Sequence, residues 1–358
     1  MNNKFGKLSI KSLGNTLGVF ILCLLTSFTA HSNDYKTILI HGFQPSQLTN
    51  PNGTNVISDG QSYWSSYWTD KADERIDWPS YERIEGKIAT DWLWPKLKQL
   101  SQSGLCESGC VLLTHSTGDL VARYLLDNQA NWLENAGLQP LNIVATFDIA
   151  GAGGGSELAD TAVSALMGGN AWDDLVEAAI YLWLGSSTVD ALGVLHDLKV
   201  NNARKIAPLP DSRAPRLRFV ANSSDFFGIT GGFLKGSDDG VVASHSACGA
   251  SRVGRFGSCS QQIAMDGKIK SQSNAVTGFM PYHYPLIMAD DYTHSNIRKA
   301  DNQGKVTIAQ NNIDVAGRNV GFQTYDKSTG FWIFKEHYRY VKNSDSKSVS
   351  QLIDSVLP

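Results

Sequence analysis

The chain has 358 residues, of which 42% are hydrophobic and 18% charged, and its formal net charge is −3 at pH 7. A chain of this length and composition can bury a large apolar core, which excludes mini-proteins and disordered segments. The small negative charge, with no long run of like charges, excludes a strongly basic surface, and we expect no nucleic-acid partner.

The N-terminal segment predicts a secretory signal peptide over residues 1–32. Three lysines precede an apolar run from Leu17 to Leu25, and small residues follow at Ala30 and Ser32. Cleavage is expected after Ser32, with Ala30 as the alternative. The run is shorter than a membrane span, which argues against a retained anchor. We therefore expect a secreted or periplasmic protein whose mature chain, residues 33–358, has no transmembrane segment.

Removal of this leader leaves four cysteines, an even number in a chain that is exported to an oxidising compartment. Three connectivities are open. We expect the two local pairs, Cys106 with Cys110 and Cys248 with Cys259. A zinc site is the alternative, but the two spacings lack a nearby set of histidine partners.

Four short apolar runs predict β-strands, most of them followed by a turn or by helical spacing. They cover Lys36–Ile40, Val111–Leu113, Asn142–Ile149 and Leu217–Ala221. Helical stretches separate these strands, so the sequence predicts an α/β fold with a mainly parallel central sheet flanked by helices.

Two helices are predicted beside the early strands, one from about Tyr81 to Leu100 with a kink at Pro95, and one after Gly118. Residues 156–205 predict a helical cap or lid. Its most apolar part, Trp172–Leu184, is expected to be either a mobile lid that meets lipid or a buried cap helix.

The C-terminal part, about residues 305–358, predicts a hairpin and a closing helix. The hairpin strands are expected at Val320–Thr324 and Phe331–Tyr340, with the turn at Asp326–Gly330. The helix is expected from Ser346 to Leu357.

The most informative motif is Thr114-His-Ser-Thr-Gly118, which follows a predicted strand and opens a predicted helix. In such an elbow the central serine stands above the sheet on a sharp turn, and small residues two places before and after it let strand and helix approach. Gly118 meets this requirement, whereas Thr114 replaces the usual glycine. The motif predicts that Ser116 is a nucleophile; the alternative is an ordinary turn serine.

A second motif, His41-Gly-Phe43, ends the first predicted strand. Attack of a hydroxyl on an ester carbonyl places negative charge on oxygen, and two main-chain N–H groups aimed at that oxygen stabilise it. We expect these donors to be Phe43 and Thr117, with Gly42 allowing close approach of the backbone. The alternative is a plain strand-ending turn.

These motifs resemble those of the α/β-hydrolases and, among them, the secreted bacterial true lipases. The likeness is carried by Ile38–Phe43, Val111–Gly118, Gly155–Asp160 and Asp239–Val242. It implies an α/β-hydrolase fold with a helical cap, activity on carboxylic esters, and contact with a lipid interface. In these lipases the acid opens an Asp-Gly-hydrophobic-Val loop and the base lies in a later loop. The resemblance therefore implies Asp239 as the acid and His294 as the base.

Chain order limits the other candidates independently, because in this fold the nucleophile precedes the acid and the acid precedes the base. His283 is the alternative base, but it lies between two tyrosines, whereas the residues before His294 are expected to form an exposed loop. Asp148, at the end of a predicted strand, and Asp238 stay open as alternatives for the acid, which must reach the far nitrogen of the histidine.

Together these residues predict a lipase or esterase that acts through an acyl-enzyme and needs no organic cofactor. Calcium is known in lipases of this type, with an acidic ligand shortly after the base; Asn296 occupies that place here, so no metal is assigned. A polyester depolymerase, a phospholipase or an acyltransferase would use the same triad. A non-catalytic binding protein with this fold is the alternative of another class.

Overall fold

The computed structural model describes residues 35–358, except for 170–173, 207–212, 255 and 270–273. The predicted signal peptide lies outside the described residues, as does Trp172 of the predicted lid. Among the described residues, no helix is both long enough and apolar enough to cross a membrane.

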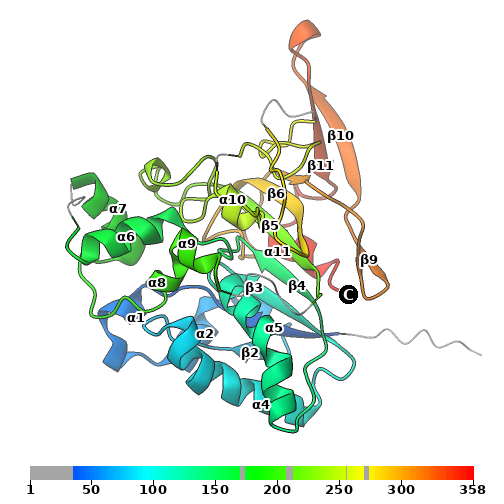
Figure 1. The fold of residues 1–358 in the computed structure, drawn as a ribbon. Helices are drawn as coiled ribbons and strands as arrows, with labels where there is room; N and C mark the ends of the chain where they lie inside the picture. The colour runs from blue at the N-terminus through cyan, green and yellow to red at the C-terminus, as the bar shows by residue number, and fades with distance from the viewer. Residues whose placement is uncertain (1–34, 170–173, 207–212, 255, 270–273) are drawn as a thin grey trace, which may run out of the picture. The chain divides into compact units, whose positions relative to one another are not determined.

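A sheet of nine strands forms the centre of the described chain, in the order β10-β11-β7-β6-β5-β4-β3-β1-β2 (Figure 1). The six neighbouring strands β6, β5, β4, β3, β1 and β2 pair in parallel. Strands β7, β11 and β10 continue the sheet beyond β6 by antiparallel pairing. The strand bounds are β1 Lys36–Ile40, β2 Glu74–Ile76, β3 Cys110–His115, β4 Ile143–Ile149, β5 Arg216–Ser223, β6 His283–Thr293, β7 Val306–Ile308, β10 Thr324–Thr329 and β11 Glu336–Val341; β8 Ile313–Val315 and β9 Arg318–Val320 form a separate pair. The predicted α/β fold with a mainly parallel central sheet is confirmed.

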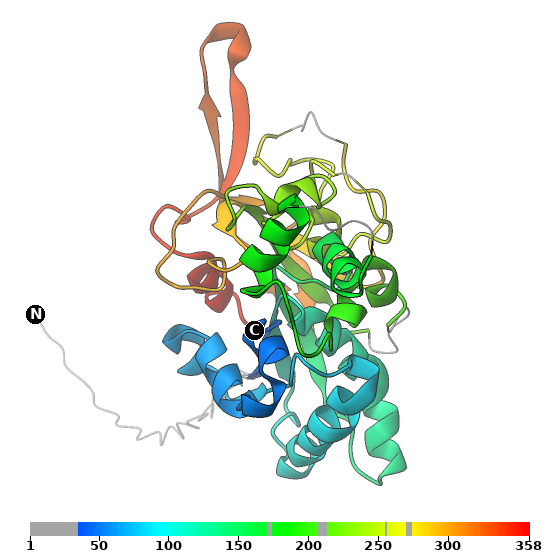
Figure 2. The same cartoon turned by 90° about the vertical axis from the view of Figure 1, so that its left-hand side faces the viewer.

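Helices cover both faces of this sheet (Figure 2). The alternation of side chains along the strands explains why both faces need cover. In β1, Ile38 and Ile40 belong to one buried apolar cluster and Leu39 to another, because successive residues of a strand point to opposite faces. The first cluster includes residues of α4 to α7. The second includes Trp68 of α3 and residues of α11.

The helices of the described residues have the following bounds: α1 Ser46–Thr49, α2 Val56–Tyr63, α3 Ser66–Thr69, α4 Trp94–Ser103, α5 Gly118–Asn135, α6 Glu157–Leu166, α7 Asp174–Leu184, α8 Leu195–Leu198, α9 Val200–Ala203, α10 Ser244–Ala247 and α11 Val349–Asp354. A π-helical segment, η2, runs from Ile84 to Leu93 and continues into α4. Pro95 is the second residue of α4, directly after the π-helical segment, and the non-helical backbone lies instead at Gly86.

Strand β6 was not expected, and the prediction of an exposed loop at 290–293 is wrong. Tyr292 is fully buried in this strand. The two adjacent acids are compatible with a strand because β7 and its approach satisfy them: Lys305 forms an ion pair with Asp290 at 2.8 Å, and Asp291 accepts a hydrogen bond from the Lys305 main chain.

The C-terminal hairpin is present, but its turn lies later than predicted. Thr324–Thr329 is strand β10, and a bidentate ion pair between Asp326 and Arg339 joins it to β11. The turn is formed by residues 330–335, so Phe331–Phe334 are not part of a strand. Opposite charges on neighbouring strands of an exposed hairpin can form an ion pair, so Asp326 is compatible with a strand. The composition of Asp326–Gly330 is typical of a turn, and the prediction therefore placed the turn too early.

The cysteines pair as expected, in the disulfides Cys106–Cys110 and Cys248–Cys259. The first joins the segment after α4 to the start of β3. Within the described residues, no group of three or more His, Cys, Asp or Glu side chains is arranged to hold a metal ion.

Candidate active site

Ser116 lies at the sharp turn between β3 and α5. Its φ is 57°, in the left-handed region that L-residues rarely adopt, and it is the residue that reverses the chain from strand to helix. A Cβ on Gly118 would lie 2.4 Å from the Ile40 carbonyl oxygen, and one on Gly42 would lie 2.7 Å from the Cβ of Ser116. Both glycines are therefore required for β1 to approach the turn this closely.

Thr114 fits the place where glycine was expected because its side chain has a partner in the next strand. Its hydroxyl donates a hydrogen bond of 2.7 Å to Asp148. The same carboxylate accepts hydrogen bonds from Thr146 and Arg218. The carboxylate of Asp148 is thus held inside the sheet by three donors. These contacts explain the threonine in the motif, and they engage the carboxylate of this alternative acid within the sheet.

His294 brings Ser116 and Asp239 into one hydrogen-bonded chain. It follows the end of β6, and its Nε2 lies 2.8 Å from Ser116 Oγ while its Nδ1 lies 2.8 Å from Asp239 Oδ2. A carboxylate can only accept, so Nδ1 carries the proton and Nε2 is left to accept one from the serine hydroxyl. All three side chains are buried.

The loop that carries Asp239 is itself held by hydrogen bonds. Asp239 Oδ1 accepts from the main-chain N–H groups of Val241 and Val242, at 3.0 and 2.7 Å. Its carbonyl oxygen accepts from the His294 N–H at 3.0 Å. The other carboxylate oxygen is therefore aimed at the imidazole, whereas the neighbouring Asp238 accepts from Gly240 within the turn.

Residues after His294 hold its loop in place. Asp225 accepts hydrogen bonds from the main chain and the hydroxyl of Ser295, at 2.9 and 2.7 Å. Asn296 accepts a hydrogen bond from the Thr293 N–H at 2.8 Å. Asn296 therefore closes the turn around His294.

His283, the alternative base, lies at the opposite end of β6 from His294. Its Nδ1 donates to the Pro281 carbonyl, and burial together with Arg218 and Arg216 holds its pKa well below 6.5. The strand that separates the two histidines has 11 residues. Its length keeps His283 away from Ser116.

The two expected main-chain donors border the same cavity as Ser116 and His294. In the part of the chain that the structure describes, neither the Phe43 N–H nor the Thr117 N–H donates a hydrogen bond to the protein. The loop that carries Phe43 is held by His41, which accepts from the Trp78 N–H and donates to the Gly42 carbonyl. Among the described residues, both N–H groups are therefore without a protein acceptor.

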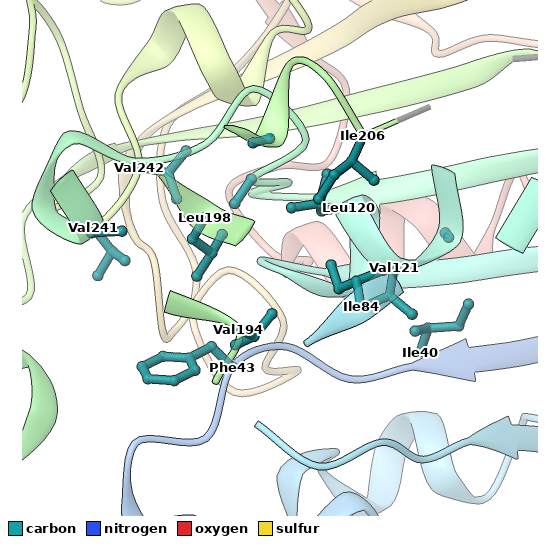
Figure 3. Packing of buried hydrophobic residues seen from close by; sticks show 14 of the residues in the cluster. Ile40, Phe43, Ile84, Leu120, Val121, Val194, Leu198, Ile206, Val241 and Val242 are labelled. Carbon is teal, nitrogen blue, oxygen red and sulfur yellow. The ribbon is translucent and has the colours of Figure 1, made fainter. Parts of the chain in front are cut away.

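The cavity has a volume of about 190 Å³ and is lined mainly by apolar side chains. Trp183 of α7 contacts Phe43, with ring centroids 5.6 Å apart. Figure 3 shows Leu198, Val241 and Val242 on the side of the cluster where Phe43 lies. The apolar walls suit a hydrocarbon chain next to the polar group formed by Ser116 and His294.

A second hydrogen-bonded group, which the sequence did not indicate, lies beside His294. His115 donates from Nε2 to the His294 carbonyl at 2.8 Å, and its Nδ1 accepts from the Tyr63 hydroxyl. Arg298 lies over the Tyr63 ring, 4.5 Å from its centroid, and donates to the Tyr63 carbonyl. The position of His115 next to Ser116 was a signal, but Tyr63 and Arg298 carry none in the sequence.

Three buried histidines should make stability depend on pH. Burial lowers the pKa of His41 below 6.5, and burial with nearby cations lowers the pKa values of His115 and His283 further. The unfolded chain binds more protons between these lowered values and 6.5, so the free energy of unfolding should rise with pH in this window and fall on acidification. The expected slope is up to about 1.4 kcal/mol per pH unit for each histidine.

Urea unfolding between pH 8 and pH 5 measures this slope. His283→Gln should remove one histidine's share, whereas the same change at His337, which is exposed on β11, should leave the slope as it is. A free energy of unfolding that is equal at pH 7 and pH 5 would contradict the prediction.

No family model and no curated protein matches this sequence. Among solved structures, the chain is similar to a Bacillus licheniformis lipase, BlEst2 in mature form, with 17% identity over 75% of this chain and 88% of that one and a TM-score of 0.45. It is also similar to EstA from Clostridium botulinum (13% identity, 74% and 83% covered, TM-score 0.39) and to a Staphylococcus hyicus lipase (11%, 75% and 89%, 0.40). At identities this low, the similarity concerns only the arrangement of strands and helices.

The fold can be assigned from the topology itself. The strand order β2-β1-β3-β4-β5-β6 is parallel throughout, and the sharp turn at Ser116 joins the central β3 to α5. Asp239 and His294 follow later strands, in the chain order serine, aspartate, histidine. The chain has the α/β-hydrolase fold.

Proposed function

We propose that this protein is an exported serine hydrolase that cleaves carboxylic esters, as a lipase or esterase. The observation that carries the proposal is the continuous chain of hydrogen bonds from Ser116 through His294 to Asp239 at the edge of an apolar cavity. A serine hydroxyl is a weak nucleophile unless an adjacent base takes its proton, and this arrangement supplies that base.

In the proposed acylation step, Ser116 Oγ attacks the ester carbonyl carbon while His294 Nε2 takes the hydroxyl proton. Asp239 stabilises the imidazolium that forms and keeps Nδ1 protonated, without taking the proton itself. The carbonyl oxygen becomes an oxyanion, which the N–H groups of Phe43 and Thr117 stabilise. Each such donor contributes about 3 kcal/mol to transition-state stabilisation in serine hydrolases.

Collapse of the tetrahedral intermediate breaks the bond to the alcohol, which leaves with the proton from His294. The acyl group stays on Ser116. A water molecule then enters, gives its proton to His294 and attacks the acyl carbon, and the carboxylic acid leaves as Ser116 regains its proton. The two half-reactions use the same groups, so no cofactor is required.

The cavity supports an acyl or alkyl chain as the group bound next to the ester. Phe43, Trp183 and Leu198 are apolar walls, and Arg298 adds one cation to the lining of the same cavity. The guanidinium favours, as a second candidate, a phospholipid whose ester lies near a phosphate. Turnover of short-chain esters, emulsified triglyceride, phospholipid and polyhydroxyalkanoate would separate these substrate classes.

Mapping the adduct of a fluorophosphonate by mass spectrometry tests the proposal directly. The label should be found on Ser116, because only a serine activated by a base reacts at an appreciable rate. Prior incubation with a soluble ester should slow labelling by competition. Absence of an adduct, or an adduct on another serine, would contradict the proposal and favour a non-catalytic binding protein.

A further inference from the structure

The turn of the C-terminal hairpin exposes four consecutive large apolar side chains. Phe331, Trp332, Ile333 and Phe334 are 81%, 84%, 84% and 77% exposed, and we call these residues the hairpin tip. In Figures 1 and 2 the ribbon of β10 and β11 extends from the rest of the sheet, and the turn lies away from the helices. Scattered exposed apolar residues are normal, but four in a row at the end of a projecting element are not.

The hairpin holds the tip in an ordered turn. The six-pair ladder ends at Thr329 and Glu336, and the Phe334 N–H donates to the Phe331 carbonyl at 3.1 Å inside the turn. Beside the last pair, Lys268 forms an ion pair of 2.8 Å with Glu336, and the Ile269 N–H donates to the His337 carbonyl. The strands directly below the tip are therefore braced, so the four side chains are presented together to the solvent.

The chemistry of the tip fits the boundary between lipid headgroups and acyl chains. Tryptophan and phenylalanine are preferred there, and a short apolar segment enters that layer without placing unpaired backbone in the hydrocarbon. Two exposed lysines, Lys327 and Lys335, flank the tip and can contact anionic headgroups. We propose that the hairpin tip docks the protein onto an anionic lipid surface by inserting Phe331–Phe334.

A protein partner and a second copy of this chain fit the tip less well. A stable protein interface takes about 20–30 residues a side, and the tip offers four side chains. Strand β10 is at the edge of the sheet, but all six of its residues are exposed, and it carries Asp326 and Lys327, which disfavour edge-to-edge pairing. On the hairpin strands, Tyr325 is the large apolar residue that is also exposed, at 42%, so the apolar surface of the hairpin is concentrated at the tip.

Docking through the tip would leave the candidate active site open. The cavity residues and the tip residues are different sets, and β11 and β7 separate β10 from β6, the strand that leads to His294. A docked protein would stay at the surface where lipid esters lie. Binding itself does not depend on catalysis, although the benefit to turnover rests on the proposed function.

Sedimentation with vesicles tests the docking. The protein is purified after export by its host and mixed with vesicles of phosphatidylcholine containing phosphatidylglycerol. Changing all four tip residues to serine should lower the partition coefficient by about 100-fold or more. A matched variant with Ile57→Ser and Met167→Ser, which are 60% and 65% exposed elsewhere, should bind like the unchanged protein. Lys327→Gln with Lys335→Gln should reduce the preference for phosphatidylglycerol.

The readouts separate this inference from the proposed function. The tip variant should hydrolyse a soluble short-chain ester at an unchanged rate, and Ser116→Ala should still bind vesicles. Equal partition of the tip variant and the unchanged protein would overturn the docking proposal, even if esters are cleaved. A dimer in analytical ultracentrifugation that the tip variant dissociates would also overturn it, because a second copy would then cover the tip.

Discussion

Replacing Ser116 by alanine is expected to lower kcat on a soluble ester by about 10⁶-fold. The change removes Ser116 Oγ, the atom that lies 2.8 Å from His294 Nε2 and would accept the acyl group. The oxyanion donors stay in place, so a small residual rate above that of water alone is expected. Steady-state kinetics with a chromogenic short-chain ester measures the effect.

Ser101→Ala provides the matched control. This serine lies in α4, where its hydroxyl donates to the Gln139 carbonyl, and it is not among the cavity residues. The control should retain the full rate, and both variants should show the circular dichroism of the unchanged protein. A Ser116→Ala variant with an unchanged rate would refute the proposed mechanism.

His294→Ala is expected to lower kcat by a similar factor, about 10⁶-fold, because the serine hydroxyl then has no base. Labelling of Ser116 by the fluorophosphonate should be lost as well. The expected loss is large since removing either member of a nucleophile–base pair disables both. The measurement is kcat together with the extent of labelling.

His283→Gln distinguishes the two candidate bases. His283 is buried at the opposite end of β6, so its replacement should lower the free energy of unfolding without removing the Ser116 label. The result that would contradict the assignment of the base is the reverse pattern, with labelling kept in His294→Ala and lost in folded His283→Gln.

The buried parallel strands could be predicted closely from the sequence. Strand β1 has the predicted bounds, and the ends of β3, β4 and β5 lie within two residues of the predicted ones. These strands are buried runs of apolar residues, so their pattern is local and strong. Strand β6 was not found, because Pro285 and two adjacent aspartates interrupt its pattern and their partners come from a distant segment.

The same distinction applies to the hairpin and to the second hydrogen-bonded group of the site. The turn at residues 330–335 depends on the register of β10 against β11, which the cross-strand pair of Asp326 and Arg339 helps to set. Tyr63 meets His115 only because α2 packs beside the elbow. Neither contact leaves a periodic signal in the chain.

The sequence by itself determined the α/β class and the sharp turn at Ser116 with Gly118 after it, and it favoured the two local disulfide pairs. All of these depend on residues close in the chain, where spacing and backbone sterics decide the outcome. Only the tertiary structure decided which imidazole meets Ser116 and which carboxylate meets that imidazole, since His294 is 178 residues away from Ser116 and 55 from Asp239. Contacts between such distant residues are set by how the strands order themselves in the sheet, and burial of both sheet faces fixes that order.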